Sequence, residues 1–198
     1  MPLGAFKAAL MGTAGVSTGD VVLLTSTTGS GVSEIDFSSK ITSTYAEYIF
    51  RFYNLGPATD EVNFTFQVNA TDGADYNDSA ITSTFFRAFN YEDASNAALG
   101  YEAASDQAQG TAFQILSAAL GNAADKSTAG ELHLFNPSST TYIKHFYSRM
   151  NEYHVSEAGV TRDQFVAGYI NDTTAIDDIR FKMSSGNFDG TIKMWGVK

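Results

Sequence analysis

Two patterns in this sequence carry residue types that could do catalytic chemistry: a serine set between glycines, and three histidines. The run Gly15-Val16-Ser17-Thr18-Gly19 matches the G-x-S-x-G elbow, in which a strand delivers a nucleophilic serine onto a sharp turn that leads into a helix. Here the order is reversed, since a short helix is expected before the run and a strand after it. Serine and glycine are frequent in this chain, so we interpret the match as coincidence.

The histidines do not form a recognisable site. His133, His145 and His154 lack the His-x-His and His-x-x-x-His spacings that place two metal ligands on one strand or helix. The chain has no cysteine, which excludes disulfides, thiolate metal sites and a thiol nucleophile. We predict no catalytic residues, no metal and no cofactor. The alternative, a sandwich-fold hydrolase or lyase, would need a cleft in which carboxylates or histidines from distant positions converge.

One loop could bind a cation. The segment Asp72-Gly73-Ala74-Asp75-Tyr76-Asn77-Asp78 places three carboxylates and one amide within seven residues. Calcium accepts oxygen ligands of this kind, but the ligand spacing of an EF-hand is absent. We interpret the segment as a polar loop between two strands, with cation binding left open.

Composition narrows the function classes further. The 198 residues include 22 acidic and 12 basic side chains, a formal net charge of -10, which argues against a nucleic-acid partner. Hydrophobic residues make up 43% of the chain, too many for a disordered acidic segment. No stretch approaches the roughly 20 apolar residues that a membrane-spanning helix needs. We expect a soluble protein with one domain at residues 21–198.

The elements that must position any site are strands. Val62, Phe64, Phe66 and Val68 alternate with polar residues, and a similar run at 46–52 precedes them, so we predict an antiparallel pair joined through the turn at 54–60. Further strands are expected at 21–25, 32–37, 81–91, 113–120, 131–134, 141–149, 165–170, 178–183 and 191–197. Such a series predicts an all-β fold, a two-sheet antiparallel β-sandwich of jelly-roll type. The Ala-rich segment Glu92 to Gln109 is consistent with a short helix or a surface loop.

Residues 1–20 are expected to form an N-terminal arm or short helix. Leu3, Phe6 and Leu10 would share one face of a helix that ends at Gly12. This face would either pack on its own domain or dock on a neighbouring subunit.

Four aromatic residues are candidates for surface contacts. Tyr45, Tyr53, Tyr147 and Trp195 are expected in the exposed phase of their strands. Exposed Tyr and Trp can stack on the apolar face of a sugar ring, and the same residues would also serve contacts between subunits or core packing.

Two C-terminal segments, Leu132-His133-Leu134-Phe135-Asn136-Pro137 continuing to Phe146, and residues 179–197, resemble virion structural proteins of tailed bacteriophages, especially marine and cyanobacterial phages. The strand pair joined through Gly56-Pro57-Ala58-Thr59-Asp60, with Gln67 in its second strand, is similar as well. The resemblance covers roughly residues 40–198.

The resemblance implies a jelly-roll-like subunit without catalytic residues. Its partners would be other capsid or tail proteins and further copies of itself, with a homotrimer favoured. Its place would be the virion, assembled in the host cytoplasm, as a capsid decoration, head fibre or tail fibre. The alternative is a glycan-binding module that recognises the host surface. Neither nucleic acid nor membrane is expected as a partner.

Overall fold

The computed structural model describes residues 20–73, 75–76, 78–154 and 159–198, which form thirteen strands and no helix. Without a helix, this described part has no helical segment that could span a membrane. The strands are β1 Val21–Val32, β2 Glu34–Phe37, β3 Glu47–Pro57, β4 Val62–Ala70, β5 Ile81–Tyr91, β6 Ala97–Tyr101, β7 Ala108–Gly110, β8 Gln114–Leu120, β9 Thr128–Phe135, β10 Lys144–Tyr153, β11 Val160–Ile170, β12 Ile176–Met183 and β13 Phe188–Val197.

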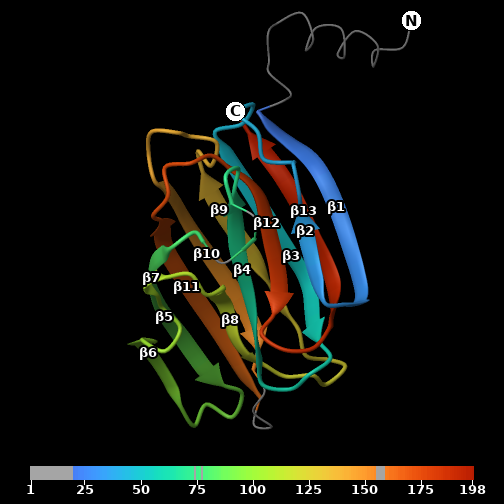
Figure 1. Ribbon diagram of the computed structural model, residues 1–198. Coiled ribbons are helices and arrows are strands. Elements are labelled where there is room, and N and C mark those ends of the chain that lie inside the picture. Colours follow the sequence, from blue (N-terminus) through green and yellow to red (C-terminus); the bar gives the residue numbers. More distant parts are fainter. Residues whose placement is uncertain (1–19, 74, 77, 155–158) are drawn as a thin grey trace, which may run out of the picture.

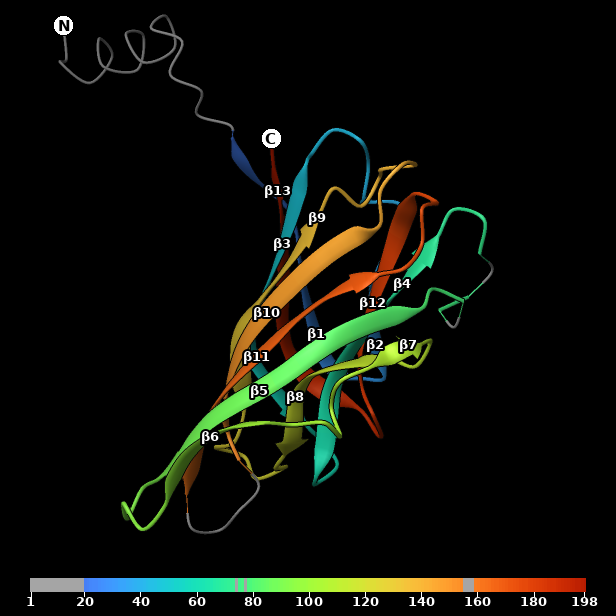
Figure 2. The same cartoon turned by 90° about the vertical axis from the view of Figure 1, so that its left-hand side faces the viewer.

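The strands form two antiparallel sheets that pack face to face (Figure 1). The larger sheet has the order β1-β13-β3-β9-β10-β11-β5-β6, with β7 also paired to β5, and the smaller has the order β2-β12-β4-β8. Figure 2 shows the long strands β10, β11 and β5 on one side of the molecule and β4 and β12 on the other. The predicted β-sandwich is confirmed.

The order of the strands is that of a jelly roll. The quartet β1-β13-β3-β9 faces the quartet β2-β12-β4-β8. Successive strands of these quartets alternate between the two sheets, except β4 and β8, which pair with each other in the smaller sheet. Strands β5 to β7 and β10 to β11 are additions to this roll. They extend only the larger sheet, which is why it is so much wider than its partner.

Phenylalanines from both sheets fill the centre of the sandwich. Phe181 of β12 contacts five other buried rings at centroid distances of 5.2 to 6.4 Å. These rings belong to Phe37, Phe50, Phe52, Phe64 and Phe66. All six side chains are at most 2% exposed, and burying each contributes about 1.5–3 kcal/mol.

The predicted pairing of segments 46–52 and 62–68 is wrong. β3 pairs with β13 and β9, whereas β4 pairs with β12 and β8 in the other sheet. Their apolar sides face each other across the core, where the rings of Phe52 and Phe64 lie 5.1 Å apart. Alternation identified the buried side of each strand correctly, but it carries no information about which neighbour supplies the hydrogen bonds.

Two further predictions concern the Ala-rich segment 92–109 and the N-terminal arm. Residues 92–109, which the sequence predicts as a short helix or a surface loop, include the strand β6 and all of β7 but its last residue. The predicted N-terminal arm, with Leu3, Phe6 and Leu10, lies outside the described residues except for Asp20.

Candidate binding face

The side of the larger sheet that points away from the smaller sheet is the broadest surface of the molecule, and we call it the outer face. Successive side chains of a strand point to opposite sides of the sheet, so every second residue of each strand lies on this face. In β10, Phe146 and Met150 point into the core, while Tyr147 and Arg149 point outward. Seven adjacent long strands present their outward residues on this face, in the order β1, β13, β3, β9, β10, β11 and β5.

The strand register arranges the outward residues in rows that cross the sheet. One row is mainly apolar and aromatic: Leu23, Trp195, Ile49, His133 and Tyr147. The next row is charged at one end and aromatic at the other: Lys193, Arg51, Glu131, Arg149, Phe165, Phe86 and Tyr101. Side chains directly opposite each other on neighbouring strands are close enough to interact, so each row is a ladder of contacts.

Within the first row, His133 stacks on Tyr147. Their ring centroids are 4.4 Å apart at an interplanar angle of 13°, and Nδ1 of His133 lies 2.5 Å from Oε1 of Glu47. Partial burial, together with the nearby carboxylates of Glu47 and Glu131, raises the pKa of the Tyr147 hydroxyl above its usual range. The ring of Tyr147 therefore stays neutral and available for stacking at physiological pH.

In the second row, contacts between neighbouring side chains fix the positions of the aromatic rings. Arg149 donates hydrogen bonds from Nε and Nη2 to the carboxylate of Asp163, and its guanidinium lies 5.0 Å from the ring centroid of Phe165. Phe165 stacks in turn on Phe86, with centroids 4.8 Å apart and planes 7° from parallel. A shallow hollow of about 240 Å³ lies among Phe86, Phe165, Tyr147 and Arg149.

Cations also cover the aromatic residues nearer β1. The guanidinium of Arg51 lies 5.4 Å from the ring centroid of Trp195 and forms an ion pair with Glu131 at 3.3 Å. The ammonium of Lys193 lies 5.2 Å from the ring of Tyr53. Trp195 is therefore half-buried under a cation, while Tyr53 keeps 40% of its surface exposed.

Three of the four predicted aromatic residues share this face. Tyr53, Tyr147 and Trp195 all point outward from the larger sheet. Tyr45 does not: it precedes β3, packs edge-to-face on the buried ring of Tyr48 at 5.8 Å, and lies against the core. Sequence reasoning missed Phe86, Phe165 and Arg149. For Arg149 a signal was present in β10, where His145, Tyr147, Arg149 and Asn151 occupy every second position.

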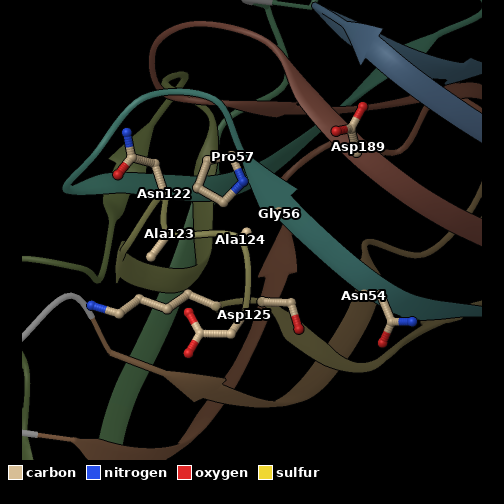
Figure 3. Close-up of a pocket in the computed structure, with 10 residues that line it drawn as sticks. Asn54, Gly56, Pro57, Asn122, Ala123, Ala124, Asp125 and Asp189 are labelled. Atoms are coloured by element: carbon tan, nitrogen blue, oxygen red, sulfur yellow. The ribbon is translucent and has the colours of Figure 1, made fainter.

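A separate polar hollow lies at one end of the sandwich, between the end of β3 and the loop from β8 to β9. Its volume is about 340 Å³, and its lining includes Asn54, Asn122, Asp125 and Asp189 (Figure 3). Oδ1 of Asp189 already accepts a hydrogen bond from the amide of Gly31 at 2.6 Å. The remaining lining consists of Gly56, Pro57, Ala123, Ala124, Lys126 and Ser127.

A polar cluster is buried between β8, β10 and β11. Glu152 of β10 is 1% exposed, and Ser117 donates to its Oε2 at 2.9 Å. Gln164 donates to the Ser117 hydroxyl at 3.1 Å, and Nη1 of Arg162 lies 3.7 Å from Oε1 of Glu152. Burial raises the pKa of Glu152 to about 7, against the opposing effects of Ser117 and Arg162.

The remaining predicted sites do not come together. The G-x-S-x-G run lies outside the described residues, as do positions 74 and 77 of the acidic loop. In the described part of the chain, no group of three or more His, Cys, Asp or Glu residues could hold a metal ion. His133 and His145 are separate positions on the outer face, and burial lowers the pKa of His154 to about 4.

Comparison with known proteins adds no family assignment: no protein-family model matches the chain, and no curated protein matches it significantly. The outer face therefore has to be interpreted from its own geometry. It is wide and rich in aromatic rings held beside charges, with hollows of about 60 to 270 Å³. Small-molecule pockets typically enclose about 300–1,000 Å³, so this surface suits a broad partner better than a small enclosed substrate.

Proposed function

We propose that this protein is a non-enzymatic structural subunit of a phage particle, a capsid decoration, head fibre or tail fibre, and that it docks on the particle through the outer face. The resemblance of residues 132–146 and 179–197 to virion proteins supports the setting. The jelly-roll strand order is compatible with it, because this architecture recurs in viral capsid proteins as well as in lectins.

The observation that carries the proposal is the size and chemistry of the outer face. Seven strands spaced about 4.8 Å apart and roughly 30 Å long present an area of about 900 Å². A stable protein interface buries about 800 Å² on each partner, so the face is large enough for one. Its Trp, Tyr and Arg side chains are the types that contribute most to binding at interfaces.

A charge reversal tests docking. Particles that lack the protein are mixed with purified wild type or with Arg149→Glu, which places a third carboxylate beside Glu131 and Asp163. We expect the variant to reduce the retained copies at least tenfold, as measured by quantitative mass spectrometry of purified particles. Arg180→Glu is the matched control, because Arg180 makes a similar pair with Asp36 on the smaller sheet, and we expect it to be retained normally.

Three results would oppose the proposal. Retention of Arg149→Glu at the wild-type level would remove the outer face as the docking surface. If deletion of residues 1–20 abolished retention while Arg149→Glu did not, docking would belong to that segment. Absence of the wild-type protein from every particle fraction would refute the structural role itself.

A second candidate function is glycan recognition, and the hollow on the outer face favours it. The 41% exposed ring of Phe86 and the 43% exposed ring of Tyr147 border this hollow, beside the guanidinium of Arg149. Such a combination offers rings for stacking and donors for sugar hydroxyls. Glycan-array binding that disappears in Phe86→Ala and Tyr147→Ala but persists in Tyr142→Ala, a 69% exposed tyrosine outside the hollow, would support it. If the protein bound none of the surface polysaccharides on the array, glycan recognition would be excluded.

A further inference from the structure

The larger sheet ends at β6, a strand whose free edge is fully accessible. All five residues of β6 are exposed, and in the described part of the chain only β5 pairs with it. Figure 1 shows β6 as the outermost strand on its side of the sheet.

The ladder with β5 determines which main-chain groups of β6 are free. The amide of Tyr91 donates to the carbonyl of Asn96, and the amide of Glu102 donates to the carbonyl of Phe85. Both pairs belong to the same register as Phe86 opposite Tyr101. Hydrogen-bonded positions alternate along an antiparallel ladder, so the main chain of Ala98 and Gly100 faces β5. The amides and carbonyls of Ala97, Leu99 and Tyr101 point away from the sheet.

This edge strand, five residues long, lacks the lysine, proline or bulge that often blocks edge-to-edge pairing, although the hydroxyl of Tyr101 donates to the carboxylate of Asp106 in the following segment. Natural proteins protect such edges with lysine, proline, a bulge or a covering segment. The sequence of β6 is Ala-Ala-Leu-Gly-Tyr, without charge or proline, and its register with β5 is unbroken. Leu99 and Tyr101 are 71% and 58% exposed and stand beside Phe86 on the outer face. An edge with this composition is suited to bind an extended, uncharged strand.

We propose that β6 pairs antiparallel with β6 of a second copy of this chain, centred on Leu99. The outward residues are symmetric about this position. Leu99 would face Leu99 of the second copy, and Ala97 would face Tyr101 in both directions, each pair exchanging two main-chain hydrogen bonds. An uncharged strand that is complementary to itself in this way forms the isologous contact typical of two-fold dimers.

The geometry of this contact suits the docking role. Paired in one continuous sheet, the two copies keep their outer faces on the same side, since directly opposed residues of an antiparallel pair point to the same face. The ladder Arg149, Phe165, Phe86 and Tyr101 would continue into Ala97 of the second copy. The inference adds a self-association contact to the proposed docking subunit and rests on that function only for its biological setting. A two-fold contact is also compatible with a trimer about another axis.

Sedimentation velocity of the full chain tests the pairing. We expect wild type to reach twice the 21.3 kDa monomer mass as concentration rises, or a multiple of two monomers where a second contact also forms. Leu99→Lys places two ammonium groups opposite each other at the centre, and Ala97→Pro removes an outward amide. Each is expected to raise the dissociation constant at least about tenfold. Ala98→Lys adds the same charge with its main chain facing β5, and we expect it to pair like wild type.

Hydrogen exchange gives a second, local readout. The amide of Leu99 should become protected as concentration rises in wild type and stay unprotected in Leu99→Lys, while the amide of Ala98 stays protected in both. The inference is overturned if wild type remains monomeric up to about 1 mM, a limit that corresponds to about 4 kcal/mol of binding. It is also overturned if association persists unchanged in Leu99→Lys and Ala97→Pro. Neither result depends on particle docking, so failure here is distinguishable from failure of the Arg149→Glu test.

Discussion

The buried carboxyl of Glu152 should make the stability of this protein depend on pH, and Glu152→Gln should remove that dependence. The amide is nearly isosteric with the protonated acid and can keep the contact with Ser117, which lies 2.9 Å away. It carries no charge at any pH. The substitution therefore isolates the cost of ionising one group inside the sandwich.

The magnitude follows from the raised pKa of Glu152. Burial moves it from 4.5 to about 7, and each pKa unit corresponds to about 1.4 kcal/mol, so ionisation of Glu152 costs the folded state about 3 kcal/mol. The pKa of Glu152 is higher in the folded state than in the unfolded state. The protonated side chain therefore makes its full contribution to the free energy of unfolding below about pH 4.5. This contribution is lost as the pH rises through about 7.

Thermal unfolding at two pH values measures the effect. At about pH 4, below the unfolded-state pKa, we expect Glu152→Gln and wild type to have nearly the same Tm. At about pH 8 we expect the variant to unfold about 6–12 °C higher, given about 2–4 °C per kcal/mol for a chain of this size. The exposed Glu61 provides the control, since Glu61→Gln changes the surface charge equally and should move Tm by about 2 °C or less at either pH. A Tm difference between Glu152→Gln and wild type that is equal at both pH values would refute the reasoning.

Two further substitutions probe the packing that supports the outer face. A Cβ at Gly130 of β9 would overlap the main-chain oxygen of Arg149, so Gly130→Ala should lower the free energy of unfolding by about 1–3 kcal/mol; Gly100→Ala, where a Cβ meets open space, should change it by less than about 1 kcal/mol. Equal urea midpoints for the two variants would contradict this. The buried ammonium of Lys144 donates to main-chain oxygens in the loop 172–174, and Lys144→Met leaves these acceptors unpaired. We expect a loss of about 2–4 kcal/mol in urea unfolding, and an unchanged midpoint would show that water replaces the ammonium.

Much of the fold was predictable because strand periodicity is a local property. Phe64 and Phe66 alternate with polar residues and are buried, as expected. Gln67 illustrates the limit. Its position in the alternation predicts exposure, yet it is fully buried, because its amide donates to main-chain oxygens of Ser79, Thr111 and Ala112. Those partners lie 12 to 45 residues away, beyond the range of any local pattern.

Strand partners were not predictable for the same reason. A polar turn between 46–52 and 62–68 resembles a hairpin connection, but it carries the chain from one sheet to the other. In a jelly roll, most hydrogen-bonded neighbours are distant in sequence, as β3 and β13 are. The candidate face was partly predictable from the sequence, because Tyr53, Tyr147 and Trp195 could be chosen as outward aromatic residues. The stack of Phe86 and Phe165 was not predictable, because it depends on the pairing of two strands about 80 residues apart.

The sequence by itself determined the class of fold and the absence of cysteine chemistry, because alternation and composition are properties of the chain alone. Only the tertiary structure decided that β5, β10 and β11 widen one sheet into a broad outer face and that β6 ends it as an open edge. The physical reason is that a side chain's inward or outward direction follows from its own strand. Its neighbours follow from register, and register is fixed by the packing of the whole sandwich.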